Sequence, residues 1–178
     1  MAVIFRLKLF TISESDHNSD RVDRITNPVN RPSDGLACMN ELRDARLIKL
    51  PKHAAGNGDG VLVVAEAAQQ VPFQIQRMFT IVAPAGAKRG RHAHRLCSQF
   101  MVCVKGAVDV VCDDGGDRKS FSLDSGELAL LVPPTLWVDI DIRQDQSILI
   151  VLCDRVYEEH DYISNYPEFL SFRKTPRV

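Results

Sequence analysis

Residues 86–106 read GAKRGRHAHRLCSQFMVCVKG, and the spacing within this stretch decides the fold. Five residues separate Gly86 from His92, one separates His92 from His94, four precede Gln99, and six more lead to Gly106. Side chains alternate along a β-strand, so two histidines at this spacing lie on the same face. We therefore expect His92 and His94 to point together toward the interior of a β-structure.

This spacing resembles the first cupin motif, in which a glutamate occupies the position of Gln99. A weaker match to the second motif is SGELALLVPPTLWV at residues 125–138, where Val138 takes the place of the last histidine ligand. A neutral amide and an aliphatic side chain leave two imidazoles without an anionic ligand, a poor set for a divalent ion. The sequence therefore predicts that no metal is bound.

Apolar runs continue on both sides of the histidines and are separated by turn residues. They are RLIKLP, GVLVVAE, FQIQRMFTIV, QFMVCVKG, AVDVVCDDGG, KSFSLDSG, LALLVPP, LWVDIDI and SILIVLC. Short runs rich in Val, Ile and Phe at even spacing are typical of a β-sandwich or barrel. We predict an all-β cupin barrel, a jelly roll, over residues 46–178, with a short helical cap at 157–174 in which Pro167 begins the last turn.

Residues 1–45 have a different character. The polar stretch SESDHNSDRVDRITNPVNRPSDG has almost no apolar periodicity and predicts a flexible arm. The preceding VIFRLKLFTI predicts a strand that docks on this protein or on a partner subunit.

Composition excludes several classes of partner. The formal net charge of the 178 residues is -1, which gives no general attraction for nucleic acid or an anionic membrane. No apolar run is long enough to span a membrane, and the N-terminus lacks the order of a signal peptide. The five cysteines contain no CxxC pair and predict reduced, structural thiols in a cytoplasmic protein.

Basic residues surround the two histidines. Lys88, Arg89, Arg91 and Arg95 read either as a solvated face or as a site for an anion. Regular alternation would place Arg91 and Arg95 on the face opposite the histidines, whereas Lys88 and Arg89 could reach the mouth of the barrel. An arginine there favours a phosphate or diphosphate ligand.

Taken together, these residues resemble the sugar 3,4-ketoisomerases, cupins of the WxcM-like group. The resemblance rests on RGRHAHR, MVCVKG, VPPTLW, the tail YEEHDYISNYPEFL, and the upstream GVLVVAE and VPFQIQRMF. It extends over residues 46–173. It implies an isomerase that acts on a dTDP-linked 4-keto-6-deoxy sugar in deoxy and amino sugar biosynthesis, and that forms a homodimer.

The chemistry implied by the resemblance is a proton transfer through an enediolate, which needs no metal or redox cofactor. His94 would be the principal base, His92 its neighbour in the relay, and Arg89 the cation that steadies the oxyanion or the diphosphate. Gln99 would bind the sugar or orient a histidine, and Arg77 would form part of the site wall.

Two further residues remain open in role. Phe79 is a candidate for substrate contact, but with Thr80 it stands where the family often carries a catalytic tyrosine. Trp137 reads as core packing or as a flat wall for the sugar or thymine ring. For Tyr157, Asp161 and Tyr162 the sequence favours capping and subunit contacts over catalysis.

Two alternatives to the isomerase remain. The lost tyrosine favours a cupin that binds a nucleotide sugar or carbohydrate without converting it. A metal-dependent cupin enzyme is the other, and metal analysis with chelation would decide it.

Overall fold

The chain folds into strands that form two five-stranded sheets and one three-stranded sheet. The computed structural model describes residues 2–6, 42–54, 56, 58, 60–124 and 126–174. In chain order the elements are β1 (Ala2–Arg6), β2 (Arg46–Lys49), β3 (Lys52–Ala54), β4 (Val61–Glu66), β5 (Arg77–Ala83), β6 (Lys88–His94), β7 (Gln99–Lys105), β8 (Val108–Asp113), β9 (Arg118–Leu123), β10 (Leu128–Val132), β11 (Trp137–Ile142), β12 (Ser147–Cys153), the 3-10 helix η1 (Glu159–Asp161), β13 (Tyr162–Ile163) and α1 (Tyr166–Lys174).

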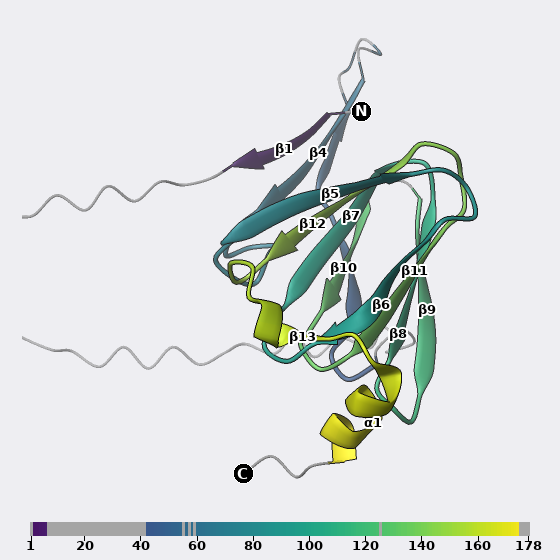
Figure 1. Cartoon of the computed structure of the whole chain (residues 1–178). Helices are drawn as coiled ribbons and strands as arrows, with labels where there is room; N and C mark the ends of the chain where they lie inside the picture. Colours follow the sequence, from purple (N-terminus) through teal and green to yellow (C-terminus); the bar gives the residue numbers. More distant parts are fainter. Residues whose placement is uncertain are drawn as a thin grey trace, which may run out of the picture. The chain divides into compact units, whose positions relative to one another are not determined.

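The two larger sheets face each other across the main core (Figure 1). Their strand orders are β2-β10-β7-β12-β5 and β13-β6-β11-β8-β9, and every neighbouring pair in them is antiparallel. Alternation sends Met101 and Val151 from the first sheet, and Val110 and Ile140 from the second, into one buried cluster. Burial of apolar area contributes about 25 cal/mol per Å², so this interior is the chief source of stability. The predicted all-β barrel is confirmed.

A third sheet, β1-β4-β3, covers the outer face of the first. Phe100 and Val102 of β7 point away from the main core and pack with Val63 of β4. Strand β1 pairs in parallel with β4, so the apolar N-terminal segment docks on its own chain. The predicted arm otherwise falls on residues 7–41, which lie outside the described residues. The division into residues 1–45 and 46–178 therefore stays a prediction.

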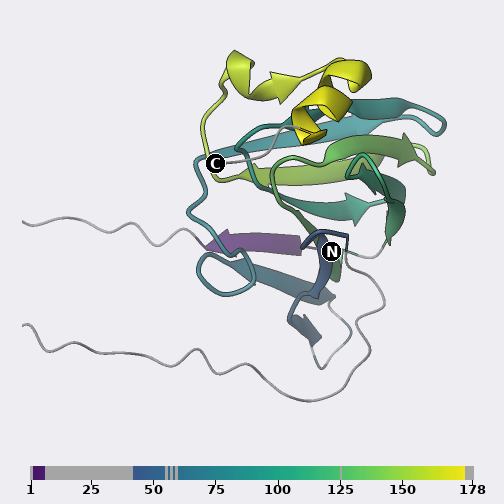
Figure 2. The same ribbon diagram turned by 90° about the horizontal axis from the view of Figure 1, so that it is seen from below.

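Helix α1 covers the outer face of the second sheet, on the side opposite β1-β4-β3 (Figure 2). Phe169 is fully buried there, in a cluster with Ala93, Trp137 and Ile163. The helix is shorter than the predicted cap of 157–174. It begins at Tyr166 because Asn165 caps it, accepting a hydrogen bond from the backbone N–H of Glu168 at 3.0 Å.

A bulge interrupts β6 immediately before the histidines. Val138 of β11 pairs with His92 and Asp139 pairs with Gly90, which leaves Arg91 without a partner in the ladder. Gly90 has a φ of 75°, and a Cβ there would lie 2.4 Å from the carbonyl oxygen of Val138. Only glycine fits this position.

The strand predicted over residues 73–82 begins only at Arg77. Its partner β12 ends at Cys153, opposite Arg77, so Phe73 and Ile75 have no strand to pair with. Phe73 and Ile75 are still partly buried, and they alternate with the exposed Gln74 and Gln76. The pattern predicted the extended backbone correctly but not the hydrogen-bonded ladder. No helix in the described part of the chain is long and apolar enough to cross a membrane.

Candidate active site

His92 and His94 lie at the end of β6 and face the inner side of their sheet. Their strand partners show this, because His92 pairs with the buried core residue Val138, whereas Ala93 pairs with Trp137 on the outer face. The two imidazole centroids are 5.0 Å apart, edge to face. Strand β13 adds Tyr162 opposite His94, and its ring centroid lies 4.3 Å from that of His94 and 5.0 Å from that of His92.

His94 is buried and hydrogen-bonded through both ring nitrogens. Its Nδ1 lies 2.7 Å from Oδ2 of Asp161, and its Nε2 lies 3.3 Å from the side-chain nitrogen of Gln99. A carboxylate only accepts hydrogen bonds, so the ring proton sits on Nδ1 and Nε2 accepts from the Gln99 amide. The other oxygen of Asp161 accepts from the backbone N–H of Leu96 at 2.6 Å. This hydrogen bond is compatible with one of the two predicted roles of Gln99, the orientation of a histidine, which stays a prediction.

The pKa shifts of His94 and Asp161 also favour a neutral ring with its proton on Nδ1. Burial lowers the pKa of His94 below its ordinary 6.5 and outweighs the hydrogen bond that Nδ1 donates to Asp161. Hydrogen bonds from His94 and from the Leu96 amide hold the pKa of Asp161 below its usual range, although burial opposes them. At neutral pH the pair is therefore a neutral imidazole beside a carboxylate.

His92 is half-buried and keeps one ring nitrogen open. Its Nδ1 lies 3.0 Å from the carbonyl oxygen of Gly90, inside the bulge, and so carries the proton. Among the described residues no group is hydrogen-bonded to its Nε2. Burial and the positive charge of Arg77 lower the pKa of His92, which keeps the ring neutral and Nε2 available to accept a proton.

The first sheet supplies the opposite wall of the site. Gln99, Cys153 and Arg77 lie in one row across β7, β12 and β5, because Cys153 pairs with Gln99 on one side and with Arg77 on the other. A terminal nitrogen of Arg77 lies 3.4 Å from the phenol oxygen of Tyr162. Its guanidinium carbon lies 5.6 Å from the ring centre of Phe79, a contact consistent with cation–π attraction.

Arg89 is not brought to the histidines. The bulge places it opposite Ile140, and its side chain is exposed at a surface recess of about 330 Å³, shared with Lys88, Arg91 and Arg118. The described residues include no hydrogen bond between Arg89 and another side chain. Its proposed role stays a prediction.

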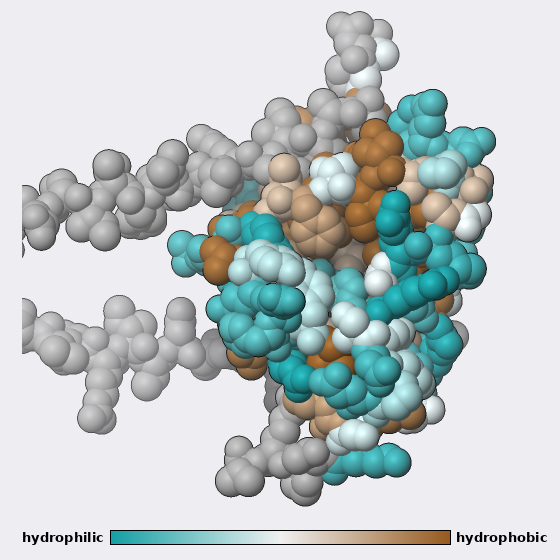
Figure 3. Space-filling model, viewed as in Figure 1, coloured by the Kyte–Doolittle hydropathy of each residue, from teal (hydrophilic) through white to brown (hydrophobic). Residues whose placement is uncertain are grey.

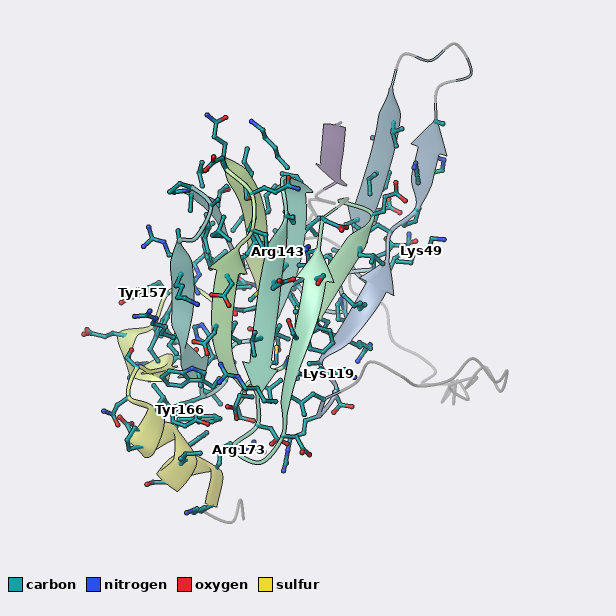
Figure 4. The ribbon with its side chains drawn as sticks, turned by 90° about the vertical axis from the view of Figure 1, so that its right-hand side faces the viewer. Lys49, Lys119, Arg143, Tyr157, Tyr166 and Arg173 are labelled. Carbon is teal, nitrogen blue, oxygen red and sulfur yellow. The ribbon has the colours of Figure 1, made fainter. Side chains whose placement is uncertain are left out.

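Trp137 lies on the face of its sheet that looks away from the histidines. It is buried under α1, with its ring centroid 5.1 Å from that of Tyr166 and 5.7 Å from that of Phe169. These are the contacts of core packing, the alternative that the sequence left open. Tyr166 begins the helix at the edge of the sheets (Figure 4).

Asp161, Tyr162 and Cys153 are the site residues that the sequence interpretation missed. It assigned Asp161 and Tyr162 to capping and subunit contacts, whereas the structure places both against His94. Cys153 ends an apolar run and read as a small hydrophobe. A signal was present in the tail, where Asp161 has no basic partner at helical spacing and so is free to serve another element.

The residues at the cupin metal-ligand positions do not form a complete set of ligands in this chain. Val138 is buried in the core and cannot coordinate, and the Gln99 amide is engaged with His94. The described residues do contain one cluster of metal-ligating types, His94, Cys97 and Asp161, with ligand atoms within 4.8 Å of one another. Two of these atoms are already joined by the 2.7 Å hydrogen bond, so the predicted acid–base roles would compete with coordination.

The family model described as FdtA, WxcM-like, C-terminal matches residues 43–174. The chain belongs to this family. A curated relative, TDP-4-oxo-6-deoxy-alpha-D-glucose-3,4-oxoisomerase of Aneurinibacillus thermoaerophilus, is 34% identical over 114 residues, which is 64% of this chain and 82% of the relative.

Solved structures of ketoisomerases match the fold. A 3,4-ketoisomerase from Helicobacter canadensis is 26% identical with a TM-score of 0.70, over 74% of this chain and 98% of that one. The sugar 3,4-ketoisomerase QdtA of Thermoanaerobacterium thermosaccharolyticum, solved with TDP, is 27% identical with a TM-score of 0.70, over 75% and 97%. These findings confirm the predicted FdtA/WxcM-like family, the cupin fold and the isomerase class.

Proposed function

We propose that this FdtA/WxcM-like protein is a sugar-nucleotide 3,4-ketoisomerase that converts a TDP-linked 4-keto-6-deoxyhexose to its 3-keto isomer. The observation that carries the proposal is the pair of neutral imidazoles, of which His92 has an open Nε2 and His94 is held between Asp161 and Gln99. The names of the ketoisomerase relatives support the substrate class.

The reaction moves one hydrogen between neighbouring carbons. A base removes the proton from C3, the electrons form a C3–C4 double bond, and negative charge collects on the oxygen of C4. That oxygen takes a proton while the C3 hydroxyl loses one; C4 is then protonated as the carbonyl forms at C3. Every proton removed is returned, so the step needs acids and bases and no oxidant.

The hydrogen bonds favour His92 for the first proton. Its Nε2 is open, whereas the nitrogens of His94 are both engaged, so His94 would serve as the relay that Asp161 keeps in one tautomer. The sequence had assigned these two roles the other way round. Burial raises the pKa of Tyr162, whose phenol therefore keeps its proton at neutral pH and can donate it to an enediolate oxygen.

Incubation with TDP-4-keto-6-deoxyglucose in deuterated water tests the proposal. We expect the 3-keto product with deuterium at C4, and a loss of about 100-fold or more in His92→Asn. His53→Asn, at an exposed histidine of β3, is the matched control and should be fully active. Absence of both exchange and product would refute the isomerase; tight binding without exchange would establish the non-catalytic alternative instead. Activity should survive chelation.

We also propose that the protein acts in the cytoplasm as a homodimer. Strand β5 is an edge of its sheet and exposes Met78 and Val82, at 57% and 63%. Beside it, Val82, Ala83 and Pro84 line a mainly apolar recess of about 440 Å³. Figure 3 shows apolar surface among hydrophilic residues on the face that carries β5 and β12. Light scattering should report twice the chain mass of 19.9 kDa, and a monomer at micromolar concentration would contradict this.

A further inference from the structure

We propose that the guanidinium of Arg77 binds the negatively charged oxygen of the enediolate, and that the Cys153 thiolate is the residue that positions it. This inference rests on the proposed isomerase function and adds a binding donor and a positioning residue to it. Its starting point is the Nε of Arg77, a donor with no hydrogen-bond partner in the part of the chain that the structure describes.

Arg77 is fixed on one side and unpartnered on the other. One terminal nitrogen donates to Cys153 Sγ at 3.5 Å and to the Tyr162 phenol at 3.4 Å. Its carbon lies between two rings, 5.6 Å from the centre of Phe79 and 5.7 Å from that of Tyr157. The Nε of Arg77 is enclosed and has no hydrogen-bond partner among the described residues. Buried donors are nearly always paired, so an unpaired one in a site wall indicates a missing acceptor.

The position of Arg77 selects the kind of acceptor. Its charge acts on both histidines and contributes to lowering their pKa values, and Tyr162, which it contacts, lies against both rings. A planar cation beside the proton-transfer groups suits an oxygen that becomes anionic when the carbon loses its proton. Tyr157, 63% exposed on the segment between β12 and η1, borders this side of the site (Figure 4).

Cys153 is placed to hold Arg77 as a counter-ion. Arg77 donates a hydrogen bond to the sulfur of Cys153 at 3.5 Å, and Gln99 is the partner of Cys153 in the strand ladder. Interactions with Cys97, Arg77 and Gln99 lower the pKa of the thiol to about 6, although burial opposes them. At neutral pH a thiolate therefore lies beside the guanidinium, fully buried in the wall.

The same sulfur joins the two halves of the site. Gln99 contacts both Cys153 and Nε2 of His94, and Arg77 contacts both Cys153 and Tyr162. Loss of the thiolate would free the guanidinium, whereas Gln99 keeps its own hydrogen bond to Nε2 of His94. A residue such as Cys153 should affect the chemical step more than substrate binding.

The first experiment titrates the thiolate by its ultraviolet absorbance, without substrate. The difference between the wild type and Cys153→Ser should show one ionisation near pH 6, and in Arg77→Gln the midpoint should move upward. Identical titrations of the wild type and Cys153→Ser below about pH 8 would overturn the counter-ion. Because the titration uses no substrate, it tests the thiolate independently of the isomerase proposal.

The second experiment is a double-mutant cycle on kcat and KM. Arg77→Gln should lower kcat by about 100-fold and Cys153→Ala by about tenfold, with KM changed little. The double variant should be no slower than Arg77→Gln, because Cys153 acts through Arg77. If the kcat losses of the two single variants multiply in the double variant, or if Cys153→Ala is fully active, the proposal is overturned.

Two further variants distinguish the loss of the thiolate from a general loss of packing. Cys112→Ala removes a thiol that is buried in the main core, where burial alone raises its pKa, and it should leave kcat unchanged. Cys153→Ser retains most of the volume but not the thiolate. It should resemble Cys153→Ala in kcat if charge is what positions Arg77, whereas wild-type kcat in Cys153→Ser would overturn the proposal.

Discussion

At the scale of single residues, Asp161 determines which nitrogen of His94 carries the proton. Both partners are buried, and their hydrogen bond of 2.7 Å fixes the tautomer and the ring plane. Without the carboxylate, Nδ1 would face a neutral group and the two tautomers would compete. The acid is therefore a positioning residue for the histidine relay.

Asp161→Asn should lower kcat by about 100-fold with little change in KM, because the amide can donate to Nδ1 and select the wrong tautomer. Steady-state kinetics on the TDP-4-keto sugar measure both constants. Asp113→Asn is a matched control, since Asp113 is also buried but accepts a hydrogen bond from the hydroxyl of Tyr166, the first residue of α1. Equal losses in the two variants would indicate a stability effect and contradict the assignment.

The pH dependence of activity follows from the same residues. Proton removal needs neutral imidazole, and burial lowers the pKa of both His92 and His94 below 6.5. The groups that face His92 are Arg77, which lowers its pKa further, and Asp139 and Asp161, which raise it. We expect kcat/KM to be level above neutrality and to fall only as the pH drops below 6.5. A kcat/KM profile with its midpoint above pH 6.5 would contradict the assignment of His92 and His94 as neutral imidazoles.

The residues predictable from sequence were those whose neighbours lie close in the chain. The spacing of His92 and His94 in one strand, and of Gln99 at the start of the next, was enough to place them on the inner face. Asp161 and Cys153 reach the same site through strand pairings across 60 residues or so of intervening chain. The alternation of a strand gives the face of a side chain, but not the side chain that will lie opposite.

At the scale of elements, the bulge in β6 determines what His92 can do. It leaves the Gly90 carbonyl free to accept from Nδ1, and this turns Nε2 toward the site. Regular alternation, assumed from sequence, predicted the faces of Arg91 and Arg95 without this extra residue. Whether a strand bulges depends on how closely it approaches its partner strand. The sequence of one strand alone does not show this.

Gly90→Ala should destabilise the fold by about 1–3 kcal/mol, because its φ is positive and a Cβ would meet the Val138 carbonyl. Urea denaturation measures the change. Gly56→Ala is the control, since a Cβ there meets nothing within 4 Å. Activity should fall together with stability, as the His92 hydrogen bond is lost. A variant as stable as Gly56→Ala would show that the bulge relaxes without cost.

At the scale of the whole molecule, the C-terminal segment connects the two larger sheets. It leaves β12 of the first sheet, passes through η1, pairs with β6 of the second sheet as β13, and ends in α1 (Figures 1 and 2). Composition predicted a cap at this end of the chain. It did not predict that the cap would also complete the site.

Phe169→Ala should cost about 3–5 kcal/mol, since the ring is fully buried between α1 and the outer face of the second sheet. Activity should fall as well, because α1 holds β13 and hence Tyr162 in place. Thermal denaturation and kcat are the measurements. Leu170→Ala, at a partly buried neighbour, should cost clearly less. Full activity in a destabilised Phe169→Ala would show that β13 holds its position without the helix.

Because Asp161 and Tyr162 lie on one uninterrupted stretch that follows β12, they can be exchanged as a cassette. Grafting the corresponding tail from another ketoisomerase would replace the histidine's carboxylate partner and the phenol in one step, with the nine strands of the two larger sheets that precede the graft left as they are. Chimeras of this kind would measure how far the tail alone sets the rate of proton transfer in such a barrel.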